Sequence, residues 1–152
     1  MKVYAYLHPE LKILCCTIGK EYVPEGVEAQ EFDVEDLNDI VFDGNQIRLK
    51  TTEEKLTERK QFVLQRLDSK IANLLSRTDY VITKLADLEL QLKLQTITQD
   101  EYNAQLNKYQ EALKQRKAIR DWASDMKSKV KSATDLDTLN RVESEIENYT
   151  IV

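Results

Sequence analysis

The sequence predicts an α+β fold, with a small N-terminal antiparallel β-meander in residues 1–50 and a helical region in residues 51–152. Two observations predict it. The 3 Gly and 2 Pro all lie before residue 45, so the long remainder of the chain lacks the residues that usually break helices. The apolar residues also change their spacing near Thr51, from the runs and alternation of strands to the steps of three and four of helices. We therefore expect two domains, divided at residue 50.

The first domain is expected to consist of short strands joined by turns. Extended stretches are predicted at residues 2–7, 11–18, 27–32, 40–42 and 47–49. His8-Pro9-Glu10 separates the first two as a turn, because Pro cannot continue a strand ladder there. Asp43-Gly44-Asn45 predicts a hairpin turn between the last two, since Gly and Asn accept the positive φ of tight turns.

The second domain is expected to be a series of amphipathic helices dominated by an antiparallel helical hairpin. The apolar stripes are Leu56, Val63, Leu67, Ile71 and Leu74; then Val81, Leu85, Leu88 and Leu92; then Tyr102, Leu106, Tyr109 and Leu113. A helix start is predicted at Thr98, because Thr98 and Glu101 match the capping box. The short loop at residues 95–97 predicts that the neighbouring helices run antiparallel, with Leu88 and Leu106 on a buried seam. A last short helix is expected to start near Thr134.

The stretch Ser76-Arg77-Thr78-Asp79-Tyr80 interrupts an apolar pattern that continues on both sides of it. Ser and Thr favour helix caps over helix interiors. We expect Ser76 or Thr78 to cap a second helix, with Asp79 near the positive end of that helix. Such a break turns one long rod into two helices that meet at an angle.

The composition excludes several classes of protein. No apolar run approaches the ~18 residues of a membrane span, and the N-terminus does not read as a signal peptide, so we expect a soluble protein that stays in the cytosol. Cys15 and Cys16 are expected to be reduced, half-buried residues. The chain has one histidine, beside Pro9, and no motif of a phosphate-binding loop or nucleophile elbow. We therefore expect no catalysis, no metal and no cofactor.

Charge is distributed unevenly along the chain. No Lys or Arg lies between Lys20 and Arg48, where acidic residues accumulate. Cations crowd the end of the third helix: Lys114, Arg116, Lys117, Arg120, Lys127, Lys129 and Lys131. We attribute them to a helix end whose cations complement its dipole. The alternative is that the acidic N-terminal part, or another protein, docks there. Nucleic acid is not expected, because the net charge is −5 and no aromatic residues interleave the cations.

Two stretches carry a resemblance to a known family. They are LLSRTDYVITK, from Leu74 to Lys84, and YQEALKQRKAIRDW, from Tyr109 to Trp122. They resemble the pattern of phage tail-fibre assembly chaperones: a helix, a T-D-[WY] break, a second helix and then Y-R-x-A-L-R-D. Arg116 to Trp122 resembles the R-x-A-x-R-D-W form of related short phage tail proteins, and the VPEG stretch and FDGNQI hairpin are similar to their N-terminal β-domains. Gln110 stands where the pattern has Arg, and Tyr80 replaces the commoner Trp.

The resemblance implies a non-enzymatic phage tail accessory protein. Its partner would be the tail fibre or receptor-binding protein, bound in the host cytoplasm during assembly. The residues selected for partner binding are Tyr80, Tyr109, Arg116, Arg120 and Trp122. Two other functions stay open: a permanent structural component of the virion tail or baseplate, and a cytosolic coiled-coil adaptor. A homo-oligomer also stays open, because leucine-rich seams do not fix the number of helices.

Overall fold

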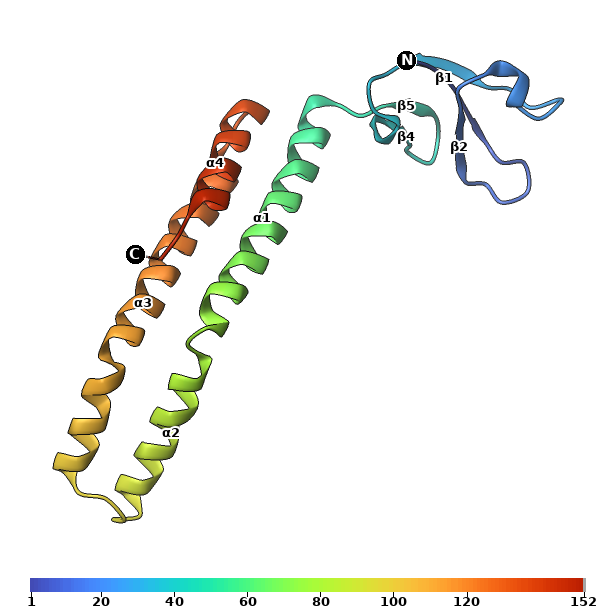
Figure 1. Ribbon diagram of the computed structural model, residues 1–152. Coiled ribbons are helices and arrows are strands. Elements are labelled where there is room, and N and C mark those ends of the chain that lie inside the picture. Colours follow the sequence, from blue (N-terminus) through green and yellow to red (C-terminus); the bar gives the residue numbers. More distant parts are fainter. Residues whose placement is uncertain (152) are drawn as a thin grey trace. The chain divides into compact units, whose positions relative to one another are not determined.

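The computed structural model describes residues 1–151, which form two compact units (Figure 1). The first unit is Met1–Thr57 and the second begins at Glu58. The predicted α+β class is confirmed, because the strands of the described chain all lie in the first unit and four α-helices follow them. Residue 50, where we predicted the division, lies just before the first helix, α1 (Thr52–Ser76), whose first residues belong to the first unit.

The first unit contains two small antiparallel sheets. The strands are β1 (Lys2–Leu7), β2 (Leu14–Thr17), β3 (Gln30–Asp33), β4 (Ile40–Phe42) and β5 (Ile47–Leu49). The first three form one sheet in the order β2-β1-β3, and β4 and β5 form a separate hairpin. The order differs from the predicted meander, because the chain after β2 crosses to the other side of β1 before it pairs again.

Local contacts explain where the strands of the first unit begin and end. His8 Nδ1 accepts the N–H groups of Glu10 and Leu11, so a turn occupies the start of the predicted second strand and β2 begins only at Leu14. Gly44 has a φ of +97°, as the hairpin prediction requires. The core consists of Val3, Ala5, Val34 and Ile40, with Leu14, Cys16, Phe32 and Ile47 packed against it. Cys15 and Cys16 are free and half-buried, as predicted.

Four helices follow: α1 (Thr52–Ser76), α2 (Asp79–Lys93), α3 (Gln99–Ser132) and α4 (Leu136–Asn148). The predicted capping box at α3 is confirmed, with both of its hydrogen bonds between Thr98 and Glu101. A second box was missed in the sequence. The Thr51 N–H donates to the Glu54 carboxylate, and the Glu54 N–H donates to the Thr51 hydroxyl, so α1 begins in the same way.

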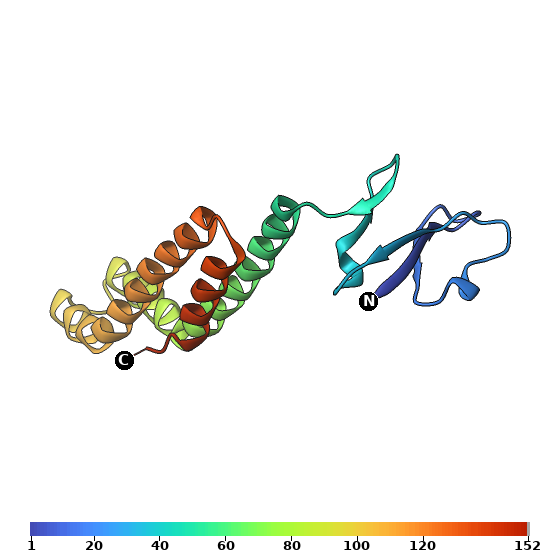
Figure 2. The same ribbon diagram turned by 90° about the horizontal axis from the view of Figure 1, so that it is seen from above.

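The helices α1, α3 and α4 pack together around one core, and both ribbon views show α4 lying beside the other two (Figures 1 and 2). The core residues are Val63, Leu67 and Leu74 of α1; Ile119, Ala123, Met126 and Val130 of α3; and Leu139, Val142 and Ile146 of α4. One charged residue lies among them. Glu143 of α4 is buried, and its carboxylate pairs with Arg59 and Arg66 of α1, which stand over the ring of Phe62.

The other half of the helical hairpin is thinner. There α2 packs along the first half of α3, as the short loop predicted, and α4 does not extend to this part of the hairpin (Figure 1). Of the predicted seam on α2, Val81 is fully buried, whereas Leu85, Leu88 and Leu92 are half-buried. Leu106 on α3 is half-buried too. The seam is therefore present, but two helices alone do not cover it.

Burial predicts a graded response to leucine truncation. Leu67, which is fully buried, should lose about 2–5 kcal/mol of unfolding free energy when it is replaced by Ala. Leu88→Ala and Leu106→Ala should cost less, about 1–2 kcal/mol, because each leucine already exposes part of its surface. Urea denaturation of the three variants measures the difference. Equal losses at Leu67 and Leu88 would contradict the described packing.

The carboxylate at the start of α1 predicts a pH dependence of stability. The guanidinium of Arg48 and the N–H of Thr51 both donate to Glu54 and lower its pKa from 4.5 to about 2. A carboxylate with a depressed pKa stabilises the fold above its unfolded pKa, and this contribution is lost as the pH falls through the folded value. We therefore expect the first unit to lose stability between pH about 4.5 and about 2, and Glu54→Gln to flatten that part of the profile.

Hydrogen exchange of the β4 and β5 amides, measured at a series of pH values, reports the stability of the first unit. The matched control is Glu53→Gln, because Glu53 makes no hydrogen bond or ion pair with another described residue. The control should keep the profile of the unmodified chain. A profile that is identical in all three proteins would show that the pair of Arg48 and Glu54 does not stabilise the start of α1.

Candidate partner-binding surfaces

The break predicted between residues 76 and 80 is confirmed. The helix α1 ends at Ser76 and α2 begins at Asp79. Arg116 reaches this break from α3, and its Nη1 atom donates to the Leu75 carbonyl oxygen at 2.9 Å, the Thr78 hydroxyl at 3.0 Å and the Asp79 carboxylate at 2.9 Å. The carbonyl groups at a helix C-terminus lack partners within the helix. One cation therefore binds the end of α1 and the start of α2 at the same time.

The expected side-chain cap does not form at the break, so that prediction was wrong. Thr78 does occupy the N-cap position of α2, but its side chain bonds no N–H group of the helix. Its hydroxyl donates back to the Leu75 carbonyl oxygen and accepts from Arg116 instead. The Ser76 hydroxyl likewise donates back, to the Asn73 carbonyl oxygen. Asp79 lies in the first turn of α2 as predicted, where Arg116 binds it.

Arg116 itself is in the interior, only 6 % exposed, and its Nε atom has no hydrogen-bond partner. A buried cation is costly unless it is paired and hydrogen-bonded. Here one carboxylate and two further oxygen atoms compensate it, all of them at the break. The geometry therefore gives Arg116 a role in fixing the joint between α1 and α2, and leaves it no surface to offer a partner.

The other four residues selected for partner binding do not form one surface. Tyr80 is 60 % exposed, and Arg120 is exposed as well. Tyr109 is half-buried on the seam toward α2. Trp122 is half-buried and stacks on Tyr149, with ring centroids 3.8 Å apart. Arg120 and Trp122 are two positions apart, so they point in directions about 200° apart around α3.

Most of the cations near the end of α3 have acidic partners. Lys117 pairs with Asp121 within the helix, Lys127 pairs with Asp68 of α1, and Lys129 pairs with Glu145 of α4. Lys129 and Lys131 also lie in the last turn of α3, where the helix dipole favours cations. A shallow groove between α1 and α3 is lined by Ile71, Arg120, Ala123, Ser124, Lys127, Ser128 and Lys131. Of the three cations in this groove, Lys127 is paired with Asp68, whereas Arg120 and Lys131 have no acidic partner among the described residues.

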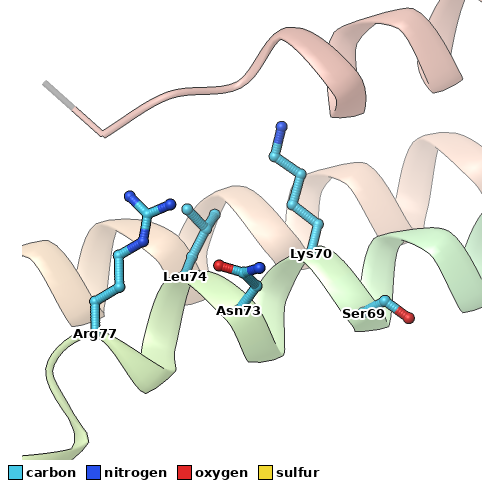
Figure 3. A pocket seen from close by; sticks show the side chains of 5 residues that line it. All are labelled: Ser69, Lys70, Asn73, Leu74 and Arg77. Atoms are coloured by element: carbon cyan, nitrogen blue, oxygen red, sulfur yellow. The ribbon is translucent and has the colours of Figure 1, made fainter.

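A second shallow hollow lies along α1, lined by Ser69, Lys70, Asn73, Leu74 and Arg77 (Figure 3). Figure 3 shows Lys70, Leu74 and Arg77 rising from α1 toward the segment that follows α4. The Lys70 ammonium donates to the Glu147 carbonyl oxygen at 2.6 Å, at the end of α4. The hollow therefore lies where α1 contacts the end of α4. Its five lining residues do not form a catalytic or metal-binding cluster.

The helix α2 carries apolar residues on two sides. Its seam faces α3. Away from the seam, Ile82, Ala86 and Leu90 follow one another at steps of four, and Leu94, the C-cap residue of α2, continues the series. All four are exposed, and we call them the outer ridge of α2. At 3.6 residues per turn, Leu90 lies about opposite Val81. Leu90 is 54 % and Leu94 is 66 % exposed. A surface helix needs only one apolar stripe to pack on its own domain.

The strand β2 presents an open edge. His8 N–H donates to the Ile13 carbonyl oxygen, and the antiparallel register continues from that pair through Tyr6 and Cys15. Bonded and non-bonded pairs alternate in an antiparallel ladder, so the backbone groups of Leu14 and Cys16 point to the outer side. In the described chain no other strand pairs with that side. Ile13 and Ile18, at its two ends, are 54 % and 68 % exposed.

The described residues give no further sign of a chemical site. Among residues 1–151, no group of three His, Cys, Asp or Glu side chains is placed to hold a metal ion, and no helix is long and apolar enough to cross a membrane. Compared with known proteins, the chain matches no protein-family model, no curated protein and no solved structure. The proposal below is therefore argued from the exposed surfaces of the two units.

The joint predicts a specific loss of stability. Arg116→Met should lower the unfolding free energy by about 1–3 kcal/mol, because it removes hydrogen bonds from a charged donor and leaves the Leu75 carbonyl group without this partner. Thermal and urea denaturation measure the loss. Arg120→Met is the matched control, since Arg120 is exposed and lies on the same helix. Equal stability of the two variants would contradict the role given to Arg116.

Proposed function

We propose that this chain is a non-enzymatic accessory protein of phage tail assembly, which binds a tail fibre or receptor-binding protein in the host cytoplasm while that partner folds. The open, uncharged edge of β2 is the observation that carries the proposal. The resemblance of the TDY break and of the stretch from Tyr109 to Trp122 supports it. Arg116 adds support, because it joins these two motifs in one joint.

The edge of β2 has the features of a strand-addition site. An exposed edge strand offers unpaired N–H and C=O groups to another chain. The stretch from Ile13 to Ile18 reads ILCCTI and contains neither a charge nor a Pro, the two features that commonly block such edges. An added strand would bond the backbone groups of Leu14 and Cys16 and contact the exposed side chains at both ends.

The opposite edge of the same sheet is protected. In β3, Glu31 pairs with Lys2 at 2.7 Å, and Asp33 pairs with the N-terminal ammonium group at 2.7 Å. Charges on an edge strand discourage pairing with a second chain. The two edges therefore differ: β3 carries charged residues that discourage pairing, and β2 carries none. This contrast supports a binding role for β2.

A folding fibre is a partner of suitable chemistry. Before its chains trimerise, a β-rich fibre exposes apolar surface and unpaired strand edges, and such species aggregate. A chaperone that pairs with one of these edges protects it and leaves when the trimer contacts outcompete it. The backbone bonds of strand addition depend little on side-chain identity, which suits transient binding of a partner that still changes its structure.

The test is co-expression with the neighbouring fibre gene. We expect the fibre alone to be mostly insoluble, and co-expression with this chain to give soluble trimer. Ile13→Lys and Ile18→Lys place charges at the open edge and should reduce the yield of trimer several-fold. Leu37→Lys is the matched control, because Leu37 is exposed in the same unit but lies outside β2, and it should leave the rescue intact.

Two results would contradict the proposal. A fibre that forms soluble trimer equally well without this chain needs no chaperone, and the finding of this chain at fixed stoichiometry in purified virions would then favour a structural component of the tail. Rescue by the Ile13→Lys and Ile18→Lys variants at the level of the unmodified chain would leave the chaperone function standing but remove β2 as its site.

A further inference from the structure

The proposed fibre-binding edge of β2 does not explain the outer ridge of α2, because the ridge lies on the second unit. Its four residues lie four positions apart along α2 and its C-terminal cap, and all of them are exposed. The two-helix part of the hairpin also leaves its own seam half-covered. Removing an apolar side chain from water is favourable, so a surface that covers this ridge gains stability from Leu90 and Leu94.

The charges beside the ridge indicate what covers it. Glu89 and Lys93 lie on one flank, one helical turn apart, and neither makes an ion pair or hydrogen bond with another described residue. On the other flank Asp87 is bonded by the side-chain amide of Gln91, at 2.8 Å. One flank thus presents an unpaired anion and an unpaired cation, and the other presents an anion that already has a partner.

We propose that the outer ridge of α2 binds the outer ridge of a second copy of this chain, with the two helices antiparallel about a two-fold axis at Leu90. In that arrangement Leu90 packs on Leu90 of the second copy, and the small Ala86 faces the large Leu94 in both directions. A two-fold contact uses the same surface of both copies, so every pair forms twice.

Charge selects the antiparallel alignment and the second copy as occupant. An antiparallel pair brings like flanks together, and so places Glu89 of each copy near Lys93 of the other. The two positions are offset by two residues from exact opposition, about 3 Å along the helix axis, which the long side chains span. The same axis brings the two Glu89 side chains near each other at an equal offset, so the paired flank contains two attractive pairs and one repulsive pair. A parallel pair would instead bring Glu89 near Asp87 of the second copy twice, with no attractive pair at that offset. The antiparallel alignment is therefore the more favourable of the two.

The experiment measures the mass of the full-length chain in solution by sedimentation velocity over a range of concentrations. We expect a dimer that dissociates on dilution. Leu90→Lys should raise the dissociation constant about tenfold or more, because it buries two like charges at the axis. Ile18→Lys, on the first unit, is the control and should leave the dimer unchanged. Circular dichroism checks that each variant keeps its helices.

Charge reversal gives a sharper test. Glu89→Lys and Lys93→Glu should each weaken the dimer, since each variant places like charges together on the paired flank. A mixture of the two single variants should form a mixed dimer, because each Lys then meets a Glu of the other protein. The double variant, with both changes in one chain, should recover the affinity of the unmodified protein.

Three outcomes would overturn the proposal. The first is a chain that stays monomeric at all concentrations. The second is a dimer that neither Leu90→Lys nor the charge reversals weaken, since it would use another surface. The third is a monomer that loses its binding to the fibre in Leu90→Lys, because the ridge would then be a binding site for the fibre. The fibre rescue by β2 is measured separately with the variants at Ile13 and Ile18, so either proposal can fail without the other.

Discussion

The helical unit depends on one buried cation, Arg116, at the place where two helices must stop and start. The last carbonyl groups of α1 have no partner within the helix, and the first turn of α2 needs a group that orients it. Arg116 supplies donors to the Leu75 carbonyl oxygen and binds Asp79 across the break. It stands on α3, so the same contact ties both helices to the third. Along α3, the residues of the seam with α2 before this position are half-buried, whereas fully buried residues such as Ile119 and Met126 follow it.

Most of the architecture could be predicted because it follows local rules. The steps of three and four fix the helical stripes, and the capping box at Thr98 marks the start of α3 to the residue. The same signature at Thr51 and Glu54 was present and was overlooked. The strand order was not predictable in this way. Residues 18–29 could return to either side of β1, and no local signal of the sequence distinguishes the two orders.

The candidate site was harder to predict than the fold. Sequence motifs drew attention to Arg116 and Trp122, but conspicuous residues on a helix are often the ones that hold it together: Arg116 binds the joint and Trp122 stacks on Tyr149. The surfaces that distinguish this chain are made of ordinary residues. An edge strand is revealed only by the order of the sheet, and the outer ridge of α2 only by learning which side of that helix faces α3. Both surfaces expose apolar side chains, with no charge on the edge of β2 and charges of both signs beside the ridge, and the two proposals depend on these features.

The most direct measurement of the joint is nuclear magnetic resonance of the arginine side chains in the intact protein. Exposed guanidinium groups rotate and exchange their protons rapidly with water, whereas a buried group held by three acceptors at once should do both slowly. The account predicts that Arg116 gives separate, slowly exchanging Nη protons, which are assigned to it because these signals disappear in Arg116→Lys. If the signals of Arg116 were averaged and exchanged like those of exposed Arg120, the cation would not be fixed at the break, and the central contact described here would be wrong.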